Sequence, residues 1–119
     1  MIKQLDDIPA DVLGFAVEQK LTAEDYETVL IPAIENHLKT HSDVRALCVF
    51  GEEFDGVEAA AMWEDAKIGL KHIKAWERIA VVSDTEWIKT MVKVGGFALP
   101  FAVRTFDLDK LEDAKHWLA

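Results

Sequence analysis

An α/β domain is the fold class that the sequence predicts, with about five strands in a mostly parallel sheet, an N-terminal antiparallel hairpin and about four helices. Two observations lead to this prediction. Short apolar runs with β-branched residues alternate along the chain with segments of helical periodicity. Two strand-like runs precede the first helix, whereas each later one follows a helix. Strands joined by helices pair in parallel through right-handed crossovers.

Five segments have the pattern of strands. The first two flank a turn that contains Pro9, which predicts the hairpin. The third and fourth are nearly all apolar, as in strands buried on both faces of a sheet. The fifth is the last strand of the chain. In chain order the expected strands are residues 1–5, 12–18, 44–50, 78–83 and 102–106.

Capping residues mark the starts of four helices, because a side-chain oxygen at the N-cap accepts a hydrogen bond from one of the first free N–H groups. The capping residues are Thr22 with Asp25, Asp55 with Glu58, Asp84, and Asp109 with Glu112. The helices are expected to end at about residues 41, 74, 94 and 118. Pro32 has no backbone N–H, so a kink or a break is expected in the first helix.

Composition indicates one domain over residues 1–119 and excludes several classes of protein. The net charge of −9 argues against nucleic-acid binding, which needs an excess of Lys and Arg. No apolar run reaches the roughly 18–20 residues that span a bilayer, and the N-terminus lacks the apolar region of a secretory signal. A single cysteine excludes an internal disulfide framework. We therefore expect a cytoplasmic globular domain.

Charge is distributed unevenly along the chain. The whole net charge of −9 lies in residues 1–60, and the remainder of the chain is neutral. Lys67 and Lys71 are four residues apart, as are Lys89 and Lys93, so each pair shares one face of its helix. These four lysines are candidates to attract anionic headgroups at the inner membrane surface. The alternative is an ordinary solvated helix face.

Large apolar side chains in the second and third helices exceed what docking on a sheet requires. They either complete a small core or form an apolar pocket, a membrane contact or an interface with a second subunit. Gly95 and Gly96 can absorb large backbone changes, so they are the expected hinge of a lid over about residues 91–101. The candidate pocket and lid residues are Met62, Trp63, Trp87, Met91, Phe97 and Phe101.

Patterns for catalysis and metal binding are weak. Cys48 lies within an apolar strand and has no base beside it in the sequence. His37 and His41 are four residues apart, but Leu38 stands where a zincin motif has glutamate. No serine has the surroundings of a nucleophile elbow. The sequence therefore predicts no enzyme, no catalytic residue, no metal site and no cofactor.

Three segments carry a resemblance to a known family. They are residues 21–26 (Leu-Thr-Ala-Glu-Asp-Tyr), residues 63–72 (Trp-Glu-Asp-Ala-Lys-Ile-Gly-Leu-Lys-His), and residues 77–84 (Glu-Arg-Ile-Ala-Val-Val-Ser-Asp) with Trp87. Over nearly its whole length the chain resembles the SpoIIAA-like proteins. The resemblance implies the β-α superhelix of STAS domains and a grouping with lipid-binding domains of the CRAL-TRIO type.

The same resemblance invites a comparison with anti-sigma-factor antagonists of the STAS class. These carry a phosphorylated serine at the start of the helix after the third strand, where this chain has Phe54-Asp55-Gly56-Val57. No hydroxyl group is present there, and Glu52 and Glu53 add fixed negative charge. A phosphorylation switch is therefore not expected at this position.

Two functional hypotheses follow from the sequence. The first is a non-catalytic binding domain for a hydrophobic small molecule or lipid, with transient peripheral contact at a membrane. The second is a STAS-like regulatory module that binds a protein through Glu52, Glu53 and Asp55 and has no phosphorylatable serine. In both cases we expect a homodimer, because exposed aromatic side chains on so small a domain favour burial against a second copy.

Overall fold

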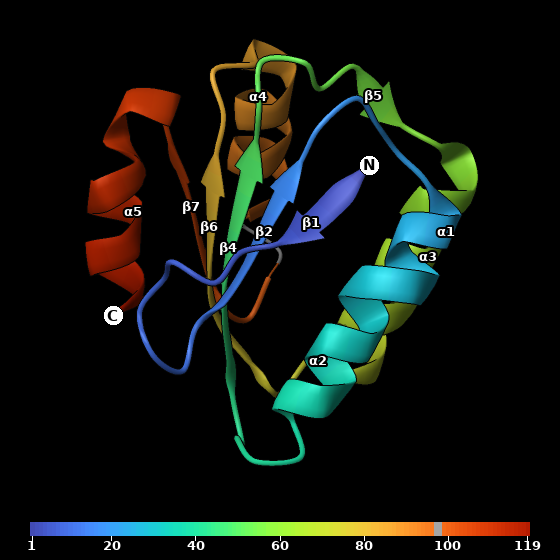
Figure 1. Ribbon diagram of the computed structural model, residues 1–119, viewed down its shortest axis with the longest axis vertical. Coiled ribbons are helices and arrows are strands. Elements are labelled where there is room, and N and C mark those ends of the chain that lie inside the picture. Colours follow the sequence, from blue (N-terminus) through green and yellow to red (C-terminus); the bar gives the residue numbers. More distant parts are fainter. Residues whose placement is uncertain (97–98) are drawn as a thin grey trace.

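A sheet lies at the centre of the computed structural model, which describes residues 1–96 and 99–119 and, between residues 64 and 70, only the side chain of Lys67. Within these residues the sheet has five strands in the order β1–β2–β4–β6–β7 (Figure 1). β1 pairs antiparallel with β2, and all other neighbours pair in parallel. The predicted α/β fold with an N-terminal hairpin is confirmed. The strands are β1 (Ile2–Gln4), β2 (Leu13–Val17), β4 (Val44–Phe50), β6 (Trp76–Val82) and β7 (Ala102–Phe106).

Two shorter strands, β3 (Lys20–Leu21) and β5 (Gly56–Val57), pair in parallel with each other. They were not predicted, because β5 takes up the residues at which the second helix was expected to begin. Gly56 has a φ of 149°, a conformation that other residues rarely adopt. The backbone therefore crosses residue 56 in an extended form, and the helix begins three residues later.

The helices of the described chain follow the predicted order. They are α1 (Ala23–Asp25), the π-helical turn η1 (Tyr26–Leu30), α2 (Ile31–His37), α3 (Ala59–Lys71), α4 (Glu86–Gly95), the 3-10 turn η3 (Leu108–Lys110) and α5 (Leu111–Leu118). None of them combines the length and the apolar character that crossing a bilayer requires. Asp84 was expected to cap α4, but its carboxylate accepts a hydrogen bond from the Leu108 N–H at 3.0 Å.

The first predicted helix accommodates Pro32 by a change in its hydrogen-bond pattern. Thr22 and Asp25 form the predicted capping box, with the Thr22 hydroxyl 3.2 Å from the Asp25 N–H and the Asp25 carboxylate 2.9 Å from the Thr22 N–H. Pro32 stands in the first turn of α2, directly after η1. In η1 the Ile31 N–H donates to the Tyr26 carbonyl, five residues back. This wide turn takes the place of the predicted break, because Pro32 has no N–H to continue the regular pattern.

Helices cover the two faces of the sheet unequally (Figure 1). On one face α5 packs Ala114 and Leu118 against Leu47, Ala80 and Val82 of the sheet, and all five side chains are buried. The remaining helices cover the opposite face, where a second apolar cluster joins η1, α2 and α4 to β1, β2, β4 and β6.

Two arginines hold the end of α5 against the sheet. Arg45 Nη1 donates to the Leu118 carbonyl at 2.6 Å, and Arg78 Nη1 donates to the Trp117 carbonyl at 2.7 Å. The guanidinium of Arg78 also lies 5.6 Å from the centre of the Trp117 ring. Positive charge at a helix C-terminus complements the free carbonyls there, so these contacts stabilise the α5 face.

Candidate binding cavity

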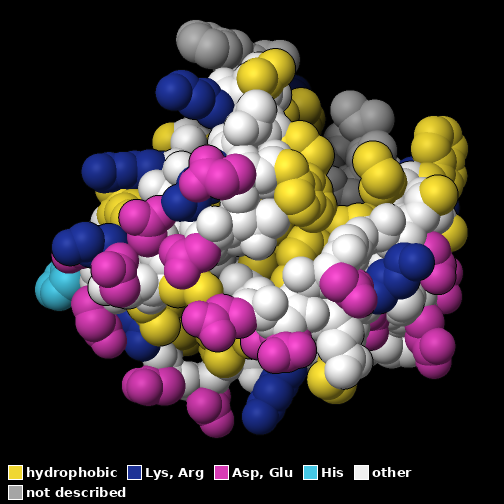
Figure 2. Space-filling view, turned by 90° about the horizontal axis from the view of Figure 1, so that it is seen from above, with side chains coloured by type: hydrophobic (Ala, Val, Ile, Leu, Met, Phe, Trp, Pro, Cys, Tyr) yellow, Lys and Arg dark blue, Asp and Glu magenta, His cyan; other side chains and the backbone are white. Residues whose placement is uncertain are grey.

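A cavity of about 570 Å³ lies between the sheet and the helices opposite α5. All five strands of the sheet, β3, η1 and α2 contribute to its wall, together with Leu99 and Phe101 ahead of β7. Seen from the carboxyl ends of the parallel strands, hydrophobic side chains gather at the centre of the molecule (Figure 2). The lining residues are Ile2, Phe15, Val17, Leu21, Tyr26, Leu30, Ile34, Ala46, Cys48, Phe50, Ile73, Trp76, Ile79, Val81, Leu99, Phe101 and Val103.

The position of α3 explains why space remains on this face of the sheet. A helix that connects two parallel strands commonly packs directly on the sheet. In the described backbone, however, α3 packs mainly against α1 and η1 (Figure 1). The inward side chains of β4 and β6, among them Ala46 and Ile79, therefore face the cavity.

Polar groups are sparse in the cavity wall. Among the lining residues that the structure describes none is charged, and the polar side-chain atoms belong to Tyr26, Cys48 and Trp76. The indole N–H of Trp76 is buried and has no acceptor among the described residues. A charged group that entered the cavity would lose its hydration without gaining a counter-charge. A hydrocarbon chain would enter without such a desolvation cost. The cavity is thus suited to an apolar occupant.

Two groups of aromatic side chains border the cavity. Trp76 and Phe101 both line it, and their ring centroids are 6.1 Å apart. On the side of the β4–α3 loop, Phe50 lines the cavity and lies 4.9 Å from Phe54, which in turn lies 5.9 Å from Trp87. The second group connects the cavity wall to the surface, because Trp87 is 46% exposed.

The structure separates the residues that the sequence assigned to the pocket. Phe101 lines the cavity, whereas Met62, Trp63, Trp87 and Met91 are exposed on α3 and α4. Phe97 lies outside the described residues. Periodicity predicted that these helices carry surplus apolar side chains, but it could not indicate that the surplus faces outward. Most of the observed lining consists of strand residues that sequence patterns identify only as core.

The four predicted membrane cations all lie on α3 and α4. Lys71 is 3.1 Å from the Glu35 carboxylate, and Lys89 pairs with Asp107, so neither charge is free of a local partner. Lys67 and Lys93 are exposed on α3 and α4.

The predicted hinge glycines lie at the end of α4. Gly95 is the last residue of the helix, and Gly96 caps it with a φ of −63°, in the ordinary right-handed region. Apart from the helix's own backbone and the adjoining residues, no described atom lies within 4 Å of the position that a Cβ would occupy at either glycine. Glycine is therefore not required by the conformation described here.

The acidic loop between β4 and β5 is anchored to the end of β2. The Glu18 carboxylate accepts a hydrogen bond from the Glu53 N–H at 3.2 Å. It also fills the space beside Gly51, where an added Cβ would lie 1.7 Å from a Glu18 oxygen. Phe54, at the position expected for a regulatory serine, is buried against the cavity wall. The loop therefore contributes packing to the cavity and exposed carboxylates to the surface.

His37 and His41 stack at the far end of the sheet, with ring centroids 4.0 Å apart. His41 Nε2 donates to the Asp11 carboxylate at 2.8 Å, and this hydrogen bond raises the pKa of His41. Burial lowers the pKa of His37. Among the residues described, no group of three or more His, Cys, Asp or Glu side chains is placed to hold a metal ion. The stack connects the end of α2 to the hairpin turn.

Comparison with known proteins agrees with this architecture. The family model described as SpoIIAA-like matches residues 12–119. The chain belongs to the SpoIIAA-like family. A solved structure with a SpoIIAA-like fold, that of an uncharacterized protein of the DUF3478 family from Shewanella loihica PV-4, is similar to it at 32% sequence identity with a TM-score of 0.80. That similarity covers 99% of this chain and 93% of the other. Comparison with the curated proteins gave no match.

Membership of the SpoIIAA-like family confirms the resemblance found in the sequence, and it supports a binding or regulatory domain. A fold of this kind does not name a ligand. Any narrower function of this SpoIIAA-like chain depends on its own side chains.

Proposed function

We propose that this SpoIIAA-like domain binds an apolar or amphiphilic small molecule in the cavity between the sheet, η1 and α2. The observation that carries the proposal is the cavity itself, which has a volume of about 570 Å³ and no charge among its described lining residues. Ligand sites in proteins commonly measure about 300–1,000 Å³ and are lined mainly by hydrophobic and aromatic side chains. The cavity meets both criteria.

The energetics favour a hydrocarbon chain as the bound group. Transfer of one methylene from water contributes about 0.8 kcal/mol, so a chain of about ten carbons would gain on the order of 8 kcal/mol. A free energy of that size corresponds to a dissociation constant of about 1 μM, before the costs of association are subtracted. Leu99 both lines the cavity and is 41% exposed. A polar headgroup would therefore lie near Leu99, where it could keep its hydration.

The single cysteine supplies a direct test, because Cys48 lines the cavity and no second thiol competes for a label. The rate of modification by N-ethylmaleimide would be measured with and without 1-decanol. We expect decanol to slow the reaction in a saturable manner, whereas glycerol at the same concentration should not. Mass spectrometry of an organic extract of the purified protein should identify a co-purified lipid. An unchanged labelling rate together with a lipid-free extract would contradict the proposal.

Transient contact with a membrane is the second part of this proposed function. Trp87, Met91 and Val94 form an exposed apolar stripe on α4, and Lys93 lies beside it. A lysine close to an anionic bilayer contributes about 1 kcal/mol. Flotation with vesicles that contain phosphatidylserine should carry the protein upward, and Trp87→Ser with Met91→Ser should abolish this. Flotation that is equal for wild type and the double variant would refute a role of the stripe.

A regulatory protein-interaction module is the second candidate function. The observation that favours it is the exposed acidic loop with Glu52, Glu53 and Asp55 at the carboxyl end of the sheet. Reversal of these three charges to lysine should then abolish binding of a purified basic partner and leave decanol protection of Cys48 intact. If the reversal leaves every protein contact unchanged, the loop has no such role.

A further inference from the structure

The free edge of the sheet at β7 is a feature that the cavity does not explain. β7 pairs with β6 on one side, and no strand in the described part of the chain pairs with its other side. The Ser83 N–H donates to the Phe106 carbonyl at 2.9 Å, so the peptide groups of Phe106 face β6. Peptide groups of successive residues in a strand alternate between its two sides. Those of Val103 and Thr105 therefore face outward, away from β6.

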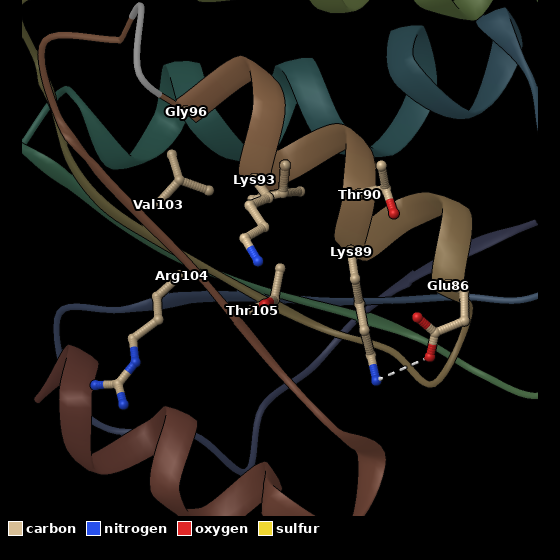
Figure 3. Close-up of a pocket in the computed structure, with 9 residues that line it drawn as sticks. Glu86, Lys89, Thr90, Lys93, Gly96, Val103, Arg104 and Thr105 are labelled. Atoms are coloured by element: carbon tan, nitrogen blue, oxygen red, sulfur yellow. Dashed lines mark ion pairs between the residues drawn. The ribbon is translucent and has the colours of Figure 1, made fainter.

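This edge opens into a groove of about 690 Å³ between α4 and β7. Figure 3 shows that Lys93 extends from α4 toward β7, whereas Arg104 projects from the opposite side of the strand toward α5. One cation thus lies on each face of the sheet beside the same row of outward peptide groups. Thr90 and Thr105 add hydroxyl groups to the groove.

Both cations are available to a partner. Neither Lys93 nor Arg104 forms an ion pair with any residue that the structure describes. Lys93 is exposed, and the Arg104 guanidinium lies over the Phe106 ring at 4.9 Å from its centre. By contrast, Lys89 at the end of the groove already pairs with Asp107, which raises the pKa of Lys89. Unpaired positive charge at this edge is notable in a chain with a net charge of −9.

We propose that the β7 edge binds an extended acidic segment of a partner protein as an added strand. Pairing with the peptide groups of Val103 and Thr105 would fix its register. Neighbouring residues of a strand point to opposite faces, so two adjacent carboxylates would meet Lys93 on one face and Arg104 on the other. Charged residues on an edge strand can also act only to prevent unwanted pairing with other chains. That protective role predicts no preference for acidic segments over basic ones. This site does not depend on the ligand cavity.

The test uses the whole chain and a six-residue peptide in which adjacent Glu and Asp are flanked by Val and Thr. Titration followed by amide NMR should give saturable binding, and hydrogen exchange of the Val103 and Thr105 amides should slow. A peptide with lysines in place of the two acids should bind at least roughly tenfold more weakly, because attraction becomes repulsion.

Two variants separate strand addition from general attraction. Lys93→Glu with Arg104→Glu should weaken binding of the acidic peptide roughly tenfold or more, whereas the matched control Lys3→Glu with Lys39→Glu should change it less than about threefold. Thr105→Pro removes one outward N–H and keeps the pairing with β6, so it should also abolish binding.

Three outcomes would overturn the assignment. They are equal binding of the lysine peptide, binding that leaves the exchange of the Val103 and Thr105 amides unchanged, and a dimer in which a second copy of the chain already protects those amides. Decanol protection of Cys48 should be the same in all these variants, so failure at this edge is distinguishable from failure of the cavity proposal.

Discussion

Replacing Ala46 with leucine tests directly whether the face of the sheet opposite α5 has room for a ligand. Ala46 lies on β4, lines the cavity and is 4% exposed. In a close-packed core the added carbon atoms would clash, and overpacking of this kind costs typically about 1–3 kcal/mol. Here the side chain extends into the cavity, so its three added carbons leave water at about 0.8 kcal/mol each. We therefore expect a stabilisation of up to about 2 kcal/mol.

Urea unfolding followed by tryptophan fluorescence measures this change, and the m-value should stay constant because the unfolded state is not altered. Ala102→Leu is the matched control, since residue 102 is exposed on β7 and the same substitution there should change stability by less than about 0.5 kcal/mol. Ala46→Leu should also weaken the protection of Cys48 by decanol. Destabilisation of Ala46→Leu by 1 kcal/mol or more would show that the space is absent and would refute the reasoning.

Three further perturbations follow from individual contacts. Asp11→Asn removes the carboxylate that raises the pKa of His41, so NMR titration should find that pKa nearer 6.5. Because a raised histidine pKa stabilises the fold below about pH 6.5 and loses this effect as pH rises through the folded pKa, the variant should show a flatter stability profile there. Gly95→Ala with Gly96→Ala should raise stability by about 0.4–1 kcal/mol per site, because each Cβ meets open space. Unchanged decanol binding in that variant would contradict a hinge. Arg78→Met should lower the free energy of unfolding in urea by about 1.5–3 kcal/mol, and a smaller loss would mean that the contact with α5 contributes little.

Much of the fold could be predicted from the sequence because its signals are local. The strands at residues 44–50 and 102–106 have the observed bounds, and Thr22 with Asp25 forms the expected capping box. The observed bounds of an element differ from the predicted ones where contacts with residues distant in the sequence determine them. Gly56 enters β5 because β3 lies beside it, and Asp84 does not cap α4 because its carboxylate binds the Leu108 N–H, which lies just beyond the neighbouring end of β7.

The cavity could not be predicted for a related reason. α4 carries apolar side chains on two faces, with Ile88 buried and Trp87 and Met91 exposed, and periodicity alone does not distinguish them. The lining depends on where α3 packs, and packing against α1 and η1 is a long-range contact with no local pattern. Residues such as Ile79 therefore have the same sequence pattern as any core strand residue, although they face a cavity.

The two faces of the sheet consequently have different physical roles. On the α5 face, Leu47 and Val82 are fully buried and Arg45 fastens the helix end, so close packing and directed hydrogen bonds there supply stability. On the opposite face, side chains of the same strands border a cavity. A substitution there changes the volume of the cavity and breaks fewer packing contacts than one on the α5 face. Since alternate residues of one strand serve the two faces, this domain can change what it binds through positions such as Ala46 while its neighbour Leu47 continues to hold the fold together.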